Sequence, residues 1–178
     1  MLERREIMNI LITYFSQSGN TKKIAQAIRE GLHTQDVELK PINETSPDEF
    51  QDYELVFLGS GVYASRVHSS LLNLIKKISK FPNKFIYFCT HASPKLYQTP
   101  FEKVTKILEK NNCNIIGEFD CIGENKVMSS KTRLDMIKRL PPEEQEKALR
   151  DIELAKDRPN QLDIENAKKF AESILEMS

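Results

Sequence analysis

The sequence predicts an α/β protein: a three-layer, doubly wound sandwich whose five-stranded parallel sheet has the strand order 2-1-3-4-5. Short β-branched and aromatic runs alternate with segments of helical periodicity, which is typical of a parallel sheet covered by helices on both faces. Three runs are apolar almost throughout, as expected of strands buried on both sides. The second run alternates and contains Pro41, so it belongs at an edge, where this strand order places it.

The expected strands follow from residue type and order. They are residues 9–14 (NILITY), 37–42 (VELKPI), 55–58, 85–89 (FIYFC) and 114–119 (NIIGEF). Between them the apolar residues recur every three or four positions, which predicts helices. These helical positions are Ile24, Ile28 and Leu32 in the first helix, Leu71, Leu74, Ile75 and Ile78 in the second, Phe101, Val104 and Leu108 in the third, and Ile164, Ala167, Ala171 and Ile174 in a last helix that begins after Asp163.

Length and composition bound the class of protein. The 178 residues suit a single domain spanning residues 1–178. Twenty-six Lys and Arg balance 26 Asp and Glu, which argues against nucleic-acid binding through a basic surface. No apolar run approaches the roughly 20 residues of a transmembrane helix, and the charged N-terminus does not resemble a signal peptide. Three cysteines without metal-ligand spacing indicate neither a disulfide framework nor a metal site. We therefore expect a cytoplasmic protein.

Two stretches interrupt the strand–helix pattern. Residues 1–7 precede the first strand, and we expect them to be a disordered, dispensable extension. Residues 126–158 are polar and too short for a core of their own, so they are interpreted as an insertion before the last helix. The insertion follows the fifth strand, at the sheet edge where the first loop also lies. Docking of a partner or substrate, self-association and a plain solvated surface all remain open for it.

The turn after the first strand has the composition of a phosphate-binding loop. Hydroxyl, amide and glycine residues lie where a strand passes into a helix, so backbone N–H groups and the helix N-terminus face a bound anion together. The turn contains no Lys or Arg and matches neither a P-loop nor a dinucleotide fingerprint. It suits one terminal phosphate held by neutral donors. Its residues are Ser16, Gln17, Ser18, Gly19, Asn20 and Thr21.

In this turn the sequence resembles the FMN-binding signature of the flavodoxin family. The positions in register are Tyr14, Ser16, Gly19, Thr21, Ala25 and Ile28, and Thr13 is the one departure. The resemblance implies a flavodoxin-like fold and FMN as cofactor, with its phosphate on residues 16–21. It places the isoalloxazine between two further loops, formed by Ser60, Gly61, Val62, Tyr63 and Ala64 and by Thr90, His91, Ala92 and Tyr97.

The resemblance also implies particular roles within these loops. Tyr63 is expected to stack on the flavin, and Tyr97 either stacks on it or lies at the surface. Gly61 is expected to allow the positive φ that a reorienting peptide beside flavin N5 needs. No catalytic triad, paired-carboxylate site or metal-ligand motif is evident.

Two functions remain open at this stage. One is a carrier that passes electrons to and from redox partner proteins. The other is an enzyme that oxidises or reduces a small anionic molecule, of the protoporphyrinogen dehydrogenase or quinone reductase type. The second loop is similar to that of the menaquinone-dependent protoporphyrinogen dehydrogenases, and cations are expected at the rim, at Arg66, His68, His91 and Lys95. Homodimer formation also remains open.

Overall fold

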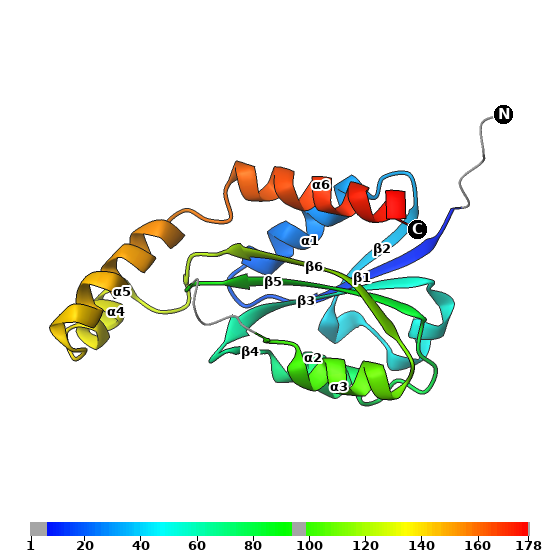
Figure 1. Ribbon diagram of the computed structural model, residues 1–178, viewed down its shortest axis with the longest axis horizontal. Coiled ribbons are helices and arrows are strands. Elements are labelled where there is room, and N and C mark those ends of the chain that lie inside the picture. The colour runs from blue at the N-terminus through cyan, green and yellow to red at the C-terminus, as the bar shows by residue number, and fades with distance from the viewer. Residues whose placement is uncertain (1–6, 94–98, 178) are drawn as a thin grey trace.

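The computed structural model describes residues 7–93 and 99–177 and confirms the predicted fold class (Figure 1). The strands are β1 (Asn9–Phe15), β2 (Asp36–Pro41), β3 (Leu55–Tyr63), β4 (Arg66–Val67), β5 (Lys84–His91) and β6 (Asn114–Ile122). The helices are α1 (Asn20–Gly31), α2 (Ser69–Ile75), α3 (Glu102–Lys110), α4 (Ser130–Ile137), α5 (Pro142–Ala155) and α6 (Gln161–Met177). Two short 3-10 helices, Ile42–Glu44 and Pro47–Asp52, connect β2 to β3.

The parallel strands are ordered β2-β1-β3-β5-β6. Because β5 and β6 are the fourth and fifth of the predicted strands, this is the predicted order 2-1-3-4-5. Helices α1 and α6 cover one face of the sheet, and α2 and α3 cover the other (Figure 1). The carboxyl ends of β1, β3, β5 and β6 therefore meet at one edge, where ligands bind in open α/β sheets.

Alternating side chains of the central strands build a core on each face of the sheet. Ile10 and Ile12 pack toward α1 and α6, whereas Leu11 packs toward the layer of α2 and α3. All three side chains are fully buried. Burial on both faces explains why the central strands are apolar almost throughout.

Several boundaries differ from the sequence-based expectation, among them those of β3, α2 and α6. Strand β3 continues past Leu58 to Tyr63, because it pairs with β5 as far as Gly61 and then forms a hairpin with β4. Helix α2 ends at Ile75, before Ile78. Helix α6 begins at Gln161, because Asp163 lies in its first turn and accepts a hydrogen bond from the N–H of Asn160 at 2.8 Å.

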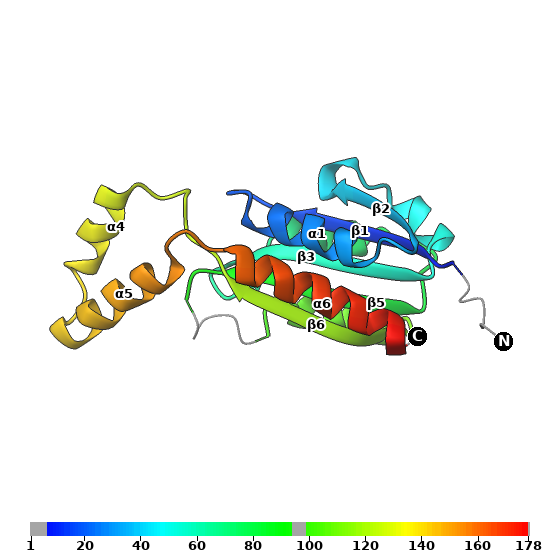
Figure 2. The ribbon, with the colours of Figure 1, turned by 90° about the horizontal axis from the view of Figure 1, so that it is seen from above.

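Residues 126–158 form a helical arm that extends beyond the carboxyl edge of the sheet (Figure 2). The arm consists of two helices, α4 and α5. The first, α4, begins after Ser129, whose hydroxyl accepts the N–H of Thr132 at 3.1 Å. At the base of the arm, Arg158 Nε donates to Asp163 Oδ2 at 2.9 Å, which joins the segment after α5 to the first turn of α6.

None of the helices described here combines the length and the apolar character that crossing a membrane requires.

Candidate functional site

The turn between β1 and α1 directs the first N–H groups of α1 toward the carboxyl edge of the sheet. Gly19 has φ 89°, in the left-handed region that glycine adopts without strain. Ser16 Oγ accepts the N–H of Lys22 at 3.3 Å, which closes the turn from inside. The unpaired N–H groups at a helix start carry partial positive charge and attract anions. The turn therefore presents the N-terminus of α1 at the carboxyl edge of the sheet.

Two residues at the start of α1 hold neighbouring strands to this turn. Thr21 Oγ1 and Thr90 Oγ1, at the end of β5, form a buried hydrogen bond of 2.9 Å. Asn20 Nδ2 donates to the carbonyl oxygen of Glu124, after β6, at 2.8 Å. The sequence analysis expected both side chains to serve as phosphate donors. In the structure they connect β1–α1 to β5 and to the segment after β6, because both are buried and have protein partners.

The end of β3 differs from the predicted second loop. Ser60 is fully buried, and its hydroxyl donates to the Gly61 carbonyl at 2.7 Å and accepts the N–H of His68 at 3.0 Å. Gly61 lies in β3 and has no positive φ. The left-handed residues are Ala64 and Ser65, with φ of 46° and 63°, because they form the turn between β3 and β4. The reorientation expected of the Gly61 peptide beside flavin N5 stays a prediction.

Tyr63 lies between the second loop and the first. Its ring meets Phe15 edge-on at a centroid distance of 5.9 Å, and it meets His68 in the same way at 5.8 Å. Burial raises the pKa of the Tyr63 hydroxyl, and a backbone hydrogen bond from Gln17 offsets part of that effect. The hydroxyl is thus neutral at physiological pH and ties the two loops together.

The expected cationic rim is much reduced in the structure. His91 is buried, with 4% of its side chain exposed, and its Nε2 lies 2.9 Å from Asp120 Oδ2. His68 caps α2 and stacks on Phe15 at 3.6 Å, so its ring is part of the packing. Arg66 is exposed on β4. Lys95 and Tyr97 lie outside the described residues.

These loops enclose a cleft of about 500 Å³ at the carboxyl edge of the sheet, named here the carboxyl-edge cleft. The predicted residues that line it are Gln17, Ser18, Asn20, Thr21, Gly61, Val62, Tyr63, Thr90, His91 and Ala92. Four other predicted residues are not among its lining: Ser16 and Gly19 shape the first turn, Ser60 is buried behind β3, and Ala64 is at the hairpin turn.

The sequence analysis missed the wall of this cleft that follows β6. That wall consists of Gly123, Glu124, Asn125, Val127, Met128, Ser129 and Thr132. Arg133 shapes the wall, because its guanidinium donates to the carbonyl oxygens of Asn125 and Met128. A signal was available: the carboxyl ends of parallel strands share one edge, so the segment after the last strand had to lie beside the other loops.

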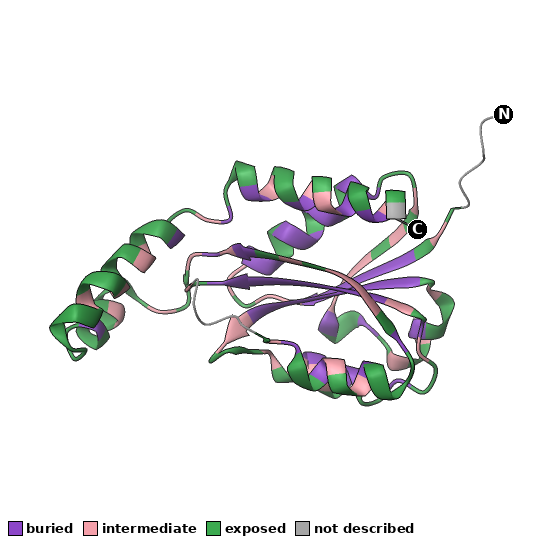
Figure 3. Ribbon diagram, in the orientation of Figure 1, coloured by how far each residue is buried: buried purple, intermediate pink, exposed green. Residues whose placement is uncertain are grey.

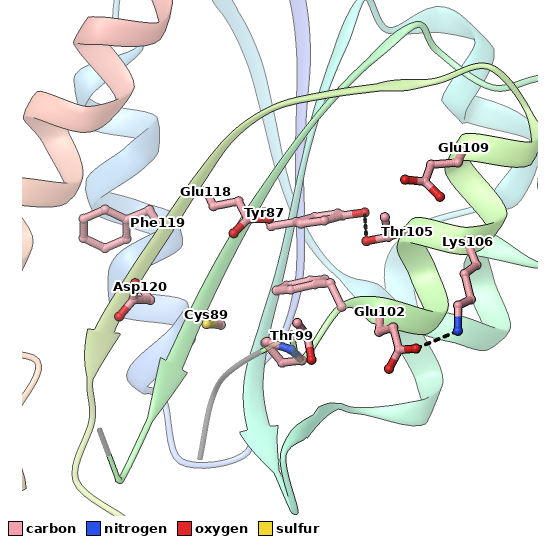
Figure 4. Close-up of a pocket in the computed structure, with 12 residues that line it drawn as sticks. Tyr87, Cys89, Thr99, Glu102, Thr105, Lys106, Glu109, Glu118, Phe119 and Asp120 are labelled. Atoms are coloured by element: carbon pink, nitrogen blue, oxygen red, sulfur yellow. Dashed lines mark hydrogen bonds and ion pairs between the residues drawn. The ribbon is translucent and has the colours of Figure 1, made fainter. Parts of the chain in front are cut away.

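A second cavity, of about 450 Å³, lies between α3 and the strands β5 and β6 (Figure 4). Its floor includes Tyr87, whose ring stacks on Phe101 at 4.1 Å. The carboxylates of Glu102, Glu109, Glu118 and Asp120 line it. Burial, together with the charges of Glu118 and Glu109, raises the pKa of Tyr87 to about 12. This acidic cavity repels a phosphate group, so it does not compete with the carboxyl-edge cleft as a phosphate site.

Thiolate and metal chemistry have no support in the described part of the chain. Burial, followed by the charges of Asp120 and Glu118, raises the pKa of the Cys89 thiol to about 12. Burial also raises the pKa of the Cys121 and Cys113 thiols. No group of three or more His, Cys, Asp or Glu in the described residues is arranged to hold a metal ion.

Replacing Thr21 by valine is expected to lower the free energy of unfolding by about 1–3 kcal/mol, because the buried Thr90 hydroxyl loses its partner. Urea denaturation measures the change. The matched control is the double variant Thr21→Val/Thr90→Val, which removes both hydroxyls and should recover much of the loss. If the double variant is destabilised by the sum of the single changes, the two hydroxyls do not act as a pair.

Comparison with known proteins shows the same family along nearly the whole chain. A family model for the flavodoxin domain matches residues 11–172. An uncharacterized protein of Methanocaldococcus jannaschii, MJ0298, is 32% identical over 169 residues, which cover 94% of this chain and 99% of that protein. The flavodoxin-like domain-containing protein BilS of Clostridioides difficile is 26% identical over 174 residues, covering 94% of this chain and 97% of that protein.

Solved structures show the same fold. The crystal structure of oxidised Flavodoxin 1 from Bacillus cereus aligns with a TM-score of 0.65 at 12% identity. The alignment covers 96% of this chain and 99% of that one.

Proposed function

This chain belongs to the flavodoxin domain family, whose cofactor is FMN, and we propose that it carries electrons between partner proteins with FMN held in the carboxyl-edge cleft. The observation that carries the proposal is the first turn. Gly19 turns the chain so that α1 starts at one end of the cleft, and Gln17 and Ser18 line that end. One terminal phosphate requires no more than such neutral donors and a helix N-terminus.

The residues around the cleft fit FMN in charge and in polarity. Among the described residues, its lining includes no Lys or Arg and one carboxylate, that of Glu124. The phosphate end therefore has no cationic side chain. Uncharged hydrogen-bond donors and the positive end of the α1 dipole face the phosphate there. Val62, Tyr63 and Ala92 also line the cleft, and their apolar and aromatic surface suits a flat aromatic ring.

When bound, FMN supplies reversible transfer of one or two electrons. The chain's own groups bind and orient it. We propose that Ser18 and the N–H groups at the start of α1 hold the phosphate, and that Tyr63 packs against the ring system and excludes water from it. The Thr21–Thr90 hydrogen bond keeps the phosphate end and the ring end of the cleft in a fixed relation.

The charge of the cleft supports the carrier over the enzyme alternative. An enzyme for a small anionic substrate needs cations beside the flavin to bind that substrate. Of the predicted rim cations in the described residues, His91 is buried against Asp120 and His68 is packed against Phe15. Arg66 is left as an exposed cation on the β4 hairpin. A single exposed arginine is a weak basis for recognising a substrate with several carboxylates.

The carrier proposal is tested by the acceptor to which the reduced FMN-loaded protein delivers electrons. We expect the protein to reduce cytochrome c, a one-electron acceptor protein, at a rate that increases linearly with acceptor concentration. Anthraquinone-2-sulfonate serves as the small anionic comparison. Saturable turnover of this quinone, combined with slow transfer to cytochrome c, would contradict a carrier and support the enzyme alternative.

Replacing Tyr63 by alanine is expected to raise the FMN dissociation constant roughly tenfold and to shift the potential of bound FMN, because the ring loses a packing surface and gains contact with water. Tyr63→Phe is the matched control: it retains the ring and removes the hydrogen bond with Gln17. Fluorescence titration measures the affinity, and equilibration with reference dyes measures the potential. If Tyr63→Ala leaves both unchanged, Tyr63 does not contact the flavin.

A further inference from the structure

The helical arm has almost no core of its own. Helix α4 has eight residues and α5 has 14, and helices of this length are marginal unless they pack against something. Within these two helices, Ile137 and Ala155 are the buried residues. The surface of the arm is largely exposed, in contrast to the buried sheet (Figure 3). Large apolar side chains are among the exposed residues: Val127, Leu134, Met136, Leu140, Leu149 and Leu154.

The two halves of the arm have opposite charge. Residues 126–140 contain five Lys or Arg and one Asp, whereas residues 142–155 contain five Asp or Glu and two Lys or Arg. Arg133 is occupied with the carbonyl oxygens of Asn125 and Met128, but Lys131 and Lys138 are exposed, and Lys138 makes an exposed contact of 3.8 Å with Asp135. They are seven residues apart, so they lie on the same face of the helix. Leu134 lies between them on that face.

The acidic half has the same spacing. Glu146 and Glu153 are seven residues apart on α5, with Leu149 between them. Each of these carboxylates contacts a cation of its own segment: Glu146 lies 2.7 Å from Arg150, and Glu153 lies 3.9 Å from Lys156. Such exposed pairs within one helix contribute little, so they do not compete strongly with an external partner.

We propose that the helical arm is a self-association surface, on which α4 of one copy of this chain packs against α5 of a second copy. A twofold axis creates this contact twice, because the α5 of the first copy then meets the α4 of the second. Lysines 131 and 138 meet glutamates 146 and 153, and the leucines between them pack in the middle. The four helices together provide the shared apolar core that one arm lacks.

The pattern of charge favours a second copy as the occupant. A different partner protein with one kind of charge would match only the basic half or only the acidic half of the arm. The exposed apolar side chains of the other half would then remain uncovered. A second copy matches the basic half and the acidic half at once. It also covers Leu134 and Leu149, which lie on different helices.

Sedimentation velocity of three full-length proteins tests the proposal. The wild-type protein is expected to be a dimer at micromolar concentration. Lys131→Glu/Lys138→Glu and Glu146→Lys/Glu153→Lys should each be monomeric, with the dissociation constant raised roughly tenfold or more by like charges. Mixing the two variants in equal amounts should restore a dimer, because every contact in the mixed pair again joins opposite charges.

The control variant reverses two lysines with the same spacing on α3, Lys103→Glu/Lys110→Glu, and should remain dimeric. Far-UV circular dichroism shows whether each variant is folded, and Leu134→Ser/Leu149→Ser, which leaves the charges in place, should also be monomeric. A monomeric wild-type protein would overturn the proposal. So would variants that remain dimeric, or folded reversed variants that do not combine when mixed.

Discussion

Ser18→Asp is expected to weaken FMN binding by roughly 100-fold, while riboflavin binding changes far less. Ser18 lines the phosphate end of the carboxyl-edge cleft, next to Gly19 and the start of α1. A carboxylate about 5 Å from the phosphate costs about 3 kcal/mol at the effective dielectric constant of a protein surface, which corresponds to this factor. Riboflavin lacks the phosphate and does not experience this repulsion. Quenching of flavin fluorescence measures both affinities.

Ser18→Asn is the matched control, because asparagine has the shape of aspartate without its charge. It should lower FMN affinity much less than Ser18→Asp does. Loss of FMN and riboflavin by the same factor would mean that Ser18 lies beside the ring system or that the variant distorts the cleft. Equal effects of aspartate and asparagine would also contradict a phosphate site at this turn.

The largest effect on stability is expected from Gly59→Ala, at about 3 kcal/mol of lost unfolding free energy. Gly59 pairs with Phe88 across β3 and β5, and the Phe88 ring lies over it. A methyl group at Gly59 would come within 2.0 Å of Phe88 Cζ. Phe88 is fully buried, so its ring cannot move aside without disturbing the core shared with α1 and α6. Urea denaturation measures the loss.

Gly117→Ala on β6 is the control for Gly59→Ala. Its new methyl group would meet the end of the flexible Ile174 side chain at 3.1 Å, which can give way. We expect a loss below about 1 kcal/mol there. In a Phe88→Leu background, Gly59→Ala should be less harmful, because the ring that it strikes is absent. Equal losses of unfolding free energy for Gly59→Ala and Gly117→Ala would contradict this explanation. So would an undiminished loss for Gly59→Ala in the Phe88→Leu background.

The fold could be predicted because its signals are local. Apolar runs such as residues 9–14 mark strands buried on both sides, and Pro41 identifies an edge strand. The first turn was also readable, since Gly19 and its polar neighbours directly precede a helix with apolar residues at every fourth position. These features depend on residues close together in the chain.

Features that depend on contacts across the chain were missed. Asn20 and Thr21 were expected as phosphate donors, and their side chains also contact Glu124 and Thr90, about 100 and 70 residues away, which the sequence did not predict. His91 was expected at the rim and is buried beside Asp120, which lies on the adjacent strand. The hairpin between β3 and β4, with positive φ at Ala64 and Ser65, was not predicted either.

The wall of the carboxyl-edge cleft that follows β6 was not predicted residue by residue either. All of its residues except Thr132 belong to the segment before α4, which is polar and lacks a strand or helix pattern until Ser129 caps the helix. The predicted strand order places this segment at the same edge as the first turn, but it does not show which of its residues line the cleft. The predicted insertion thus contributes Val127, Met128, Ser129 and Thr132 to the carboxyl-edge cleft, in addition to the projecting helices of the arm.

The central claim is that the FMN phosphate binds at the turn formed by residues 16–21. Amide chemical shifts of the isotope-labelled protein, recorded with saturating FMN and with saturating riboflavin, test it most directly. We expect the two complexes to differ most at the amides of Ser18, Gly19, Asn20 and Thr21, while those of Glu118 and Asp120 in the acidic cavity are alike in both. Identical shifts at residues 16–21 in the two complexes, or differences centred on the acidic cavity, would contradict it.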